Sequence, residues 1–120
     1  GKKRSMYDGG VRSPQIAYWP NKVPAGTVSD HISAFWDILP TLSDLTGEPI
    51  KGETDGISML PTLLGKPESQ KKHSHLYWEL YESNKPNCAV RYDNWKGVVL
   101  DTRMLAGPPR ARTHTLRIAR

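Results

Sequence analysis

Cysteine and long apolar runs are what this sequence most clearly lacks. Cys88 is the single cysteine among 120 residues, so an internal disulfide framework is excluded. No apolar run approaches the roughly 20 residues that a membrane-spanning helix needs, and we therefore expect no membrane span. The basic start at residues 1–4 has no apolar stretch behind it that could act as a signal peptide, so a signal of an exported protein would lie upstream.

Acidic residues are absent after Asp101, and this absence accounts for the net charge of +5. Five arginines lie in residues 103–120, while the twelve Lys and Arg before them equal the chain's twelve Asp and Glu. A nucleic-acid surface would interleave basic and aromatic side chains, and here the two are separated, so we expect no nucleic-acid partner. Residues 107–109, Gly-Pro-Pro, break regular structure, and we predict a basic, flexible tail over residues 103–120.

The first fourteen residues combine three adjacent cations with turn-forming residues. Gly9-Gly10 can adopt positive φ freely, and the prolyl residue at the end of residues 12–14 favours an extended exit. We therefore expect residues 2–4, Lys-Lys-Arg, on a sharply turned loop that could bind an anion. On charge alone, a solvated basic terminus followed by an ordinary turn is the commoner explanation of such a run.

The segment up to residue 72 is predicted to be rich in helix. Residues 14–20 are typical of a short buried strand bounded by prolines. From Ser29, apolar residues recur at helical spacing up to Gly47, which predicts a helix with one buried face that Ser29 or Asp30 caps at its start. Pro40 predicts either a kink or a second helix with proline in its first turn. Three further elements complete the segment: a loop over residues 48–56, a helical turn over residues 58–64 ended by Gly65, and a loop over residues 66–72.

The rest of the chain is predicted to form a small antiparallel meander. Its strands cover residues 75–81, 89–92 and 95–100, and Asp93-Asn94 suits a hairpin turn between the last two. A helix-rich part followed by such a meander is an α+β arrangement. For five aromatic residues, packing in the core is favoured over stacking on sugars or bases: Tyr77, Trp78, Tyr81, Tyr92 and Trp95.

Three further sets of residues could carry chemistry, and each has a simpler explanation. His73 and His75 would share one face of a strand and could bind a transition metal, but two ligands without a third are a weak signal. Cys88 resembles a small buried apolar residue more than a nucleophile. Three acids could serve as acid and base, although solvation at a strand edge is the commoner role: Glu79, Glu82 and Asp93.

Several separated motifs resemble the C-terminal part of type I sulfatases, in the same order and at similar spacing. Eight residues of the opening segment match a Gly-Gly-Lys-Gly-x-x-Tyr-Glu-Gly-Gly-x-Arg-x-Pro motif and the Trp-Pro strand after it: Lys3, Tyr7, Gly9, Gly10, Arg12, Pro14, Trp19 and Pro20. Asp8 stands where glutamate is usual. Later segments resemble the Asp-x-x-Pro-Thr helix, the Asp-Gly-x-Ser element and the strands of the small C-terminal sheet: residues 37–42, 55–61, 89–91 and 95–96.

The resemblance implies a fold and a division of the chain. The expected fold is α/β, with residues 1–70 forming the C-terminal portion of an alkaline-phosphatase-like sulfatase domain. Residues 71–102 would form a small, incomplete antiparallel β subdomain, followed by the tail at 103–120. After residue 101 the sequence departs from the family's Leu-Tyr-Asp-Leu element and acidic turn, which suggests a frameshift or a divergent terminus.

The resemblance also implies hydrolysis of sulfate esters by the parent enzyme. In that family a formylglycine, made from Cys or Ser in a Cys/Ser-x-Pro-x-Arg motif, attacks sulfur while a calcium ion and basic residues hold the sulfate oxygens. Of these parts Lys3 alone carries over, as a catalytic and substrate-binding residue. Cys88 does not match the motif, and the calcium ligands would lie upstream, so we expect the chain by itself to be inactive.

The partners implied are a sulfated small molecule or glycan as substrate and the missing N-terminal part of the same enzyme. A periplasmic, extracellular or lysosomal location is implied as well. Two alternatives remain open, a related phosphoester hydrolase and a non-catalytic carbohydrate- or anion-binding module. A Cys/Ser-x-Pro-x-Arg motif upstream would favour the sulfatase.

Overall fold

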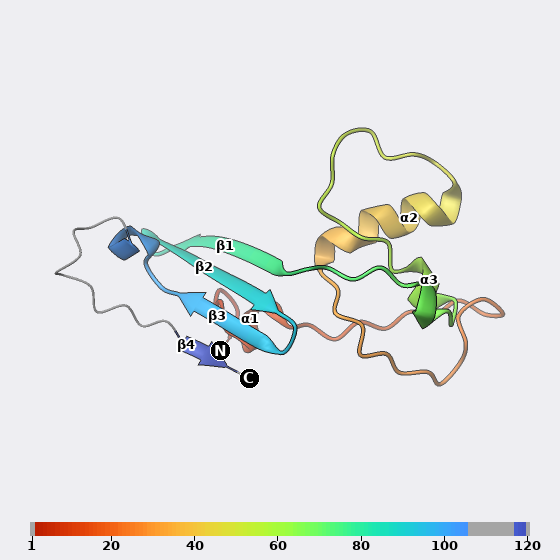
Figure 1. The fold of residues 1–120 in the computed structure, drawn as a ribbon, viewed down its shortest axis with the longest axis horizontal. Helices are drawn as coiled ribbons and strands as arrows, with labels where there is room; N and C mark the ends of the chain where they lie inside the picture. Colours follow the sequence, from red (N-terminus) through yellow and green to blue (C-terminus); the bar gives the residue numbers. More distant parts are fainter. Residues whose placement is uncertain (1, 106–116, 120) are drawn as a thin grey trace. The chain divides into compact units, whose positions relative to one another are not determined.

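The computed structural model describes residues 2–105 and 117–119, and the chain divides into two compact units (Figure 1). The first unit joins the opening segment, up to Pro14, to the part of the chain that starts at Ser74. The second unit covers residues 15–73. Within the described residues, no helix has the length and apolar character needed to cross a membrane.

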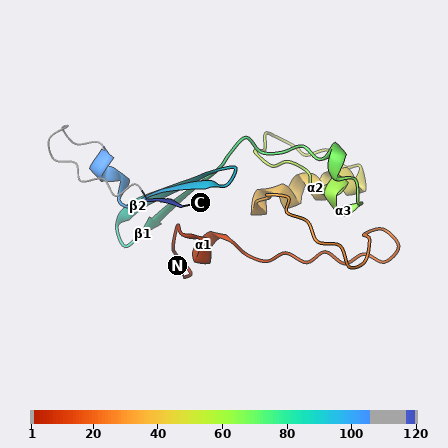
Figure 2. The ribbon, with the colours of Figure 1, turned by 60° about the horizontal axis from the view of Figure 1, so that its bottom comes forward.

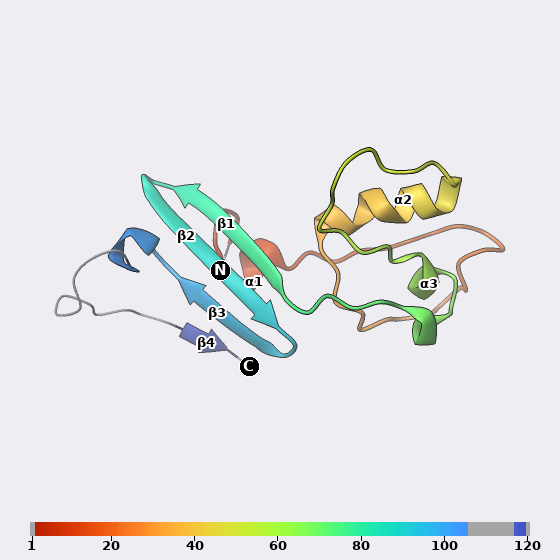
Figure 3. The same ribbon diagram turned by 45° about the horizontal axis from the view of Figure 1, so that its top comes forward.

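The first unit is built on an antiparallel sheet in the order β1-β2-β3-β4 (Figure 3). Its four strands are β1 (Leu76–Glu82), β2 (Lys85–Tyr92), β3 (Trp95–Val99) and β4 (Arg117–Ala119). Ser83 and Asn84, with φ of 52° and 59°, form the two-residue turn between β1 and β2, and Asp93, with φ of 50°, lies in the next turn. The three predicted strands and the turn at Asp93 are confirmed.

Strand β2 begins four residues earlier than predicted, because Pro86 interrupts the sequence pattern of a strand. Pro86 pairs with Tyr81 of β1, whereas pairing of β2 with β3 begins only at Cys88. Pro86 therefore lies where β2 is locally an edge strand and no hydrogen bond to β3 is required.

The core of the first unit lies on the inner face of the sheet, which we define as the face that carries Ala89 and Val98. Met6 of the opening segment is 3% exposed and packs with these two residues. The short helix α1 (Asp8–Val11) lies on the same side of the sheet (Figure 2). Because Met6 completes the core of the sheet, the opening segment groups with the sheet. The sequence had predicted that it would group with the rest of residues 1–70.

The opening turn differs from its prediction in where the backbone strain lies. Gly9 and Gly10 lie inside α1, and Arg4 has the positive φ, 66°. Gly10 is needed for space, because a Cβ there would collide with the carbonyl oxygen of Ser5 and lie 2.9 Å from that of Lys2. The turn thus folds tightly over residues 2–5.

The second unit contains η1 (Phe35–Asp37), α2 (Ile38–Thr46), α3 (Leu60–Leu63) and η2 (Pro67–Ser69). Gly47 closes α2 with φ of 76°. Pro40 lies in the first turn of α2, so the alternative of a second helix with proline in its first turn is confirmed. The predicted start at Ser29 is wrong, because the Ser29 hydroxyl accepts a hydrogen bond from the His31 amide in a local turn, and helix begins only at Phe35.

Two predictions of burial in the second unit are wrong. Residues 14–19 form no strand, and Ile16 is 93% exposed, because no strand among the described residues pairs with this segment. In α2 the residues Leu39, Leu42 and Leu45 are exposed, while Pro40 and Thr41 are buried. Leu39 and Leu42 instead line an open groove with the loop that follows the helix.

The predicted tail is described only in part. Residues 102–105 form a short 3₁₀ helix, η3 (Thr102–Leu105), and β4 pairs with β3 through its backbone. Most of the segment that was predicted to be flexible, residues 106–116, lies outside the described residues.

Candidate functional site

Lys3 lies in the tight turn that precedes α1, and its side chain is exposed. Its neighbour Arg4 directs Nη1 toward Oε1 of Glu82 at 3.5 Å, a weak and largely exposed ion pair. In the part of the chain that the structure describes, Lys3 has no hydrogen bond or ion pair to another side chain. Its ammonium is therefore available to an external anion, as the prediction for this residue requires.

The turn that carries Lys3 is attached to the sheet just after it. Met6 lies in the core, and Asp8 accepts a hydrogen bond of 2.8 Å from Nζ of Lys96 in β3. This hydrogen bond, together with the charge of Lys96, holds the pKa of Asp8 below its usual value. Sequence reasoning missed Lys96, because nothing in a strand pattern distinguishes a lysine that turns inward.

A second cluster of polar groups is buried in the second unit around Asp37. Its carboxylate is fully buried and accepts hydrogen bonds from the amides of Ala34 at 2.7 Å and Ile57 at 2.8 Å. Nε2 of His73 lies 2.8 Å from Oδ1 and 3.0 Å from Oδ2 of the same carboxylate. The cluster thus fastens the start of the helix to two segments that follow it in sequence.

His31 lies near this cluster, and its Nε2 is buried without a partner among the described residues. Burial lowers the pKa of His31 because it penalises the charged imidazolium, while the charge of Asp37 acts in the opposite direction. His31 is therefore held in its neutral form over a wider pH range than a solvated histidine.

The predicted histidine pair is not formed. His73 contacts Asp37, whereas Nδ1 of His75 contacts the hydroxyl of Ser74, and β1 begins only at Leu76. Within residues 2–105 and 117–119, no group of three or more His, Cys, Asp or Glu side chains is placed to hold a metal ion.

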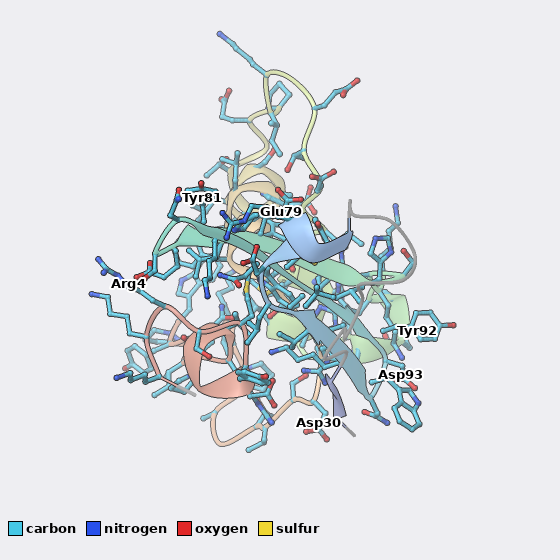
Figure 4. All side chains as sticks on the ribbon, turned by 90° about the vertical axis from the view of Figure 1, so that its left-hand side faces the viewer. Arg4, Asp30, Glu79, Tyr81, Tyr92 and Asp93 are labelled. Carbon is cyan, nitrogen blue, oxygen red and sulfur yellow. The ribbon has the colours of Figure 1, made fainter. Side chains whose placement is uncertain are left out.

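The three candidate acids are likewise separated. Glu79 accepts a hydrogen bond of 2.6 Å from the hydroxyl of Tyr77, which raises the pKa of Tyr77 to about 12, and Glu82 faces Arg4. Asp93 lies in a hairpin turn. Figure 4 shows Glu79 on the face of the sheet opposite to α1 and Asp93 at the far end of the strands, so these acids do not form a catalytic pair.

The prediction that the aromatic residues are core is wrong for four of the five. Trp78 packs against the core on the inner face of the sheet. The other four are between 48% and 66% exposed: Tyr77, Tyr81, Tyr92 and Trp95. Alternation along a strand explains the difference, because Tyr77 and Tyr81 project to the opposite face from Trp78.

Known proteins match most of the chain. The family model described as N-sulphoglucosamine sulphohydrolase, C-terminal, matches residues 2–103. Arylsulfatase A of Homo sapiens is 35% identical over 95 residues, which are 78% of this chain and 18% of that protein. N-acetylgalactosamine-6-sulfatase of Canis lupus familiaris is 38% identical over 65 residues, or 52% of this chain and 12% of that protein. The chain spans less than a fifth of the length of these relatives.

Proposed function

The chain belongs to the sulfatase family, and from this premise we propose that it forms the C-terminal part of an enzyme that hydrolyses sulfate esters. The observation that carries the proposal is the match of the family model to residues 2–103, nearly all of the described chain. Two relatives are named for a sulfatase activity, and the small share of their length that is matched is why the activity of the whole protein is proposed.

We propose Lys3 as the residue that grips the sulfate group of the substrate. A lysine ammonium is a compact positive charge, which stabilises the negative charge on the oxygens of the transferring group more strongly as that charge grows in the transition state. The exposure of Lys3 and the attachment of its turn through Met6 and Asp8 support this role.

The calcium ion and the formylglycine expected for this family are proposed for the whole enzyme, at residues other than those described here. The described residues hold no cluster of three possible ligands. Cys88 is half-buried in β2 opposite Glu79 and Val99, and the residues after it, Ala89 to Arg91, do not form a Cys/Ser-x-Pro-x-Arg motif. These residues fit neither group, and the part in the reaction that we propose for this chain is binding of the sulfate anion.

The substrate and the location are proposed from the family alone. A sulfated small molecule or glycan is the proposed substrate, and a periplasmic, extracellular or lysosomal site is the proposed location. The N-terminal part of the same polypeptide is the proposed partner of this chain.

An assay with paired substrates tests the proposed activity. A polypeptide that joins these 120 residues to their upstream coding sequence would be given an aryl sulfate and the aryl phosphate of the same leaving group. We expect faster hydrolysis of the sulfate. Faster hydrolysis of the phosphate would favour a phosphoester hydrolase, and binding of sulfated glycans without hydrolysis of either compound would favour a non-catalytic module.

A further inference from the structure

Lys96 is an unusual lysine because it is buried. It lies in β3 and is 7% exposed, although lysines are rarely buried unless they are paired. Its Nζ lies 2.8 Å from Oδ1 of Asp8 and 5.7 Å from the centre of the Trp78 ring. The carboxylate and the ring face both stabilise the ammonium, and together they offset the cost of removing it from water.

The register of the sheet explains why this lysine turns inward. Lys96 pairs with Arg91 of β2, and Val98, two residues further along β3, projects to the same inner face and is 2% exposed. The ammonium of Lys96 therefore emerges beside the core that Met6 completes. Met6 and Asp8 are two residues apart, so the opening segment is attached to the sheet by one apolar and one ionic contact.

The attached residues, Met6 and Asp8, lie within five residues of Lys3. The backbone between Lys3 and α1 is closely packed. Amides of α1 and the residue after it donate to the carbonyls of Tyr7 and Asp8, and Gly10 packs closely on the carbonyl of Ser5. The other ionic contact of the segment, from Arg4 to Glu82, is 3.5 Å long, and the Arg4 side chain is 68% exposed. Exposed pairs of this kind contribute little, so the contact between Lys96 and Asp8 is the stronger restraint.

We propose that Lys96 is a positioning residue: through Asp8 it holds the opening turn in the conformation that presents Lys3 to a sulfate group. The inference rests on the proposed function of Lys3 and extends it to a residue 93 positions later in the chain. Lys96 acts on the backbone of the turn and does not touch the anion. Placement of a charge matters because a shift of about 1 Å in a binding group can cost about a hundredfold in rate.

Replacement of Lys96 by methionine separates this role from a general contribution to stability. Met keeps most of the volume of the side chain and needs no buried charge, so the sheet should be as stable as before or more stable. Asp8 is left without its partner but is 63% exposed and stays hydrated. The variant should therefore loosen the opening turn and leave the sheet intact.

Two measurements test the proposal, amide hydrogen exchange and calorimetric titration with inorganic sulfate, both on the polypeptide that joins these 120 residues to their upstream coding sequence. In Lys96→Met we expect exchange at Gly10, Val11 and Arg12 to be about tenfold faster, with no change in the pairing of β1 with β2. The affinity for sulfate should fall about tenfold in the same variant, because the loosened turn no longer holds Lys3 in place. Lys96→Arg should restore both values to within about threefold, because it keeps the charge.

Lys85→Met is the matched control, since Lys85 is exposed at the start of β2 and is not an ion-pair partner of Asp8. It should change neither measurement. The proposal is overturned if Lys96→Met leaves exchange at residues 10–12 unchanged, or if exchange rises equally in β1 and β2, as a merely structural role requires. Weaker sulfate binding with unchanged exchange would also overturn it, because Lys96 would then act directly on the anion.

The proposed role of Lys3 fails by a different result. If the unaltered chain and Lys3→Ala show the same response to sulfate, Lys3 does not bind the anion. The contrast in exchange between Lys96→Met and Lys85→Met still decides whether Lys96 holds the turn, so the two failures are distinguishable.

Discussion

Replacing Asp37 by alanine should destabilise the second unit more than any other single substitution of an acid in it. The carboxylate is fully buried and accepts from three donors, the amides of Ala34 and Ile57 and Nε2 of His73, at 2.7 to 3.0 Å. Alanine leaves all three donors without their acceptor. A buried donor left without its acceptor costs about 1–3 kcal/mol, and with three such donors we expect a loss of about 3–5 kcal/mol in the free energy of unfolding.

The asparagine variant refines the estimate. Its side chain has one carbonyl oxygen that can accept and one amide that donates, so it cannot serve all three donors that Asp37 serves. We expect Asp37→Asn to lose about 1–3 kcal/mol, less than Asp37→Ala, because some of the hydrogen bonds are kept.

Urea unfolding combined with amide exchange at Ile57 measures these losses. Asp44→Ala is the matched control, because Asp44 is an exposed residue of α2, the helix that begins directly after Asp37, and its replacement should change stability by less than about 0.5 kcal/mol. The reasoning is refuted if Asp37→Ala and Asp44→Ala are equally stable, because the buried carboxylate would then not hold the unit together.

Three further outcomes are expected. The pKa of His31 is below its unfolded value of 6.5, so the unfolded chain binds the proton more tightly and stability should fall as pH drops below about 6.5. His31→Gln should remove this part of the pH dependence in urea unfolding at pH 7.5 and 5.5. Gly10→Ala should speed amide exchange in the opening turn, because the new Cβ collides with the Ser5 carbonyl; an unchanged rate would contradict the close packing. Glu79→Gln should lower the pKa of Tyr77 from about 12 toward 10 in an ultraviolet titration, and an unchanged pKa would contradict the hydrogen bond.

Local patterns in the sequence predicted the elements that depend on local chemistry. Gly47 and Gly65 stop helices with positive φ, and Asp93, in the predicted turn between β2 and β3, adopts the left-handed conformation that such a turn requires. Alternation along β1 and β3 was sufficient to locate both strands. These features involve residues close in sequence, so composition and spacing carry the information.

Features that depend on distant partners were not predictable from the same patterns. Ile16 and Leu39 look like core residues, yet their exposure depends on which other segments are present to cover them. Lys96 looks like a solvated residue of a strand, and its inward direction becomes clear only from its contacts with Asp8 and Trp78, which are distant in sequence. For Asp37 the motif was visible, but its contact with His73, 36 residues later, was not.

The most direct test of the central claim compares Lys3→Ala with Lys2→Ala in the longer polypeptide, with kcat/KM for an aryl sulfate as the readout. The two lysines are adjacent and exposed, so each variant removes the same charge from the same turn. We predict a loss of about 10²- to 10³-fold for Lys3→Ala, the range found for removal of one group that stabilises transition-state charge, and a loss under about threefold for Lys2→Ala. Equal activity of the two variants would contradict the assignment of Lys3 to the sulfate site.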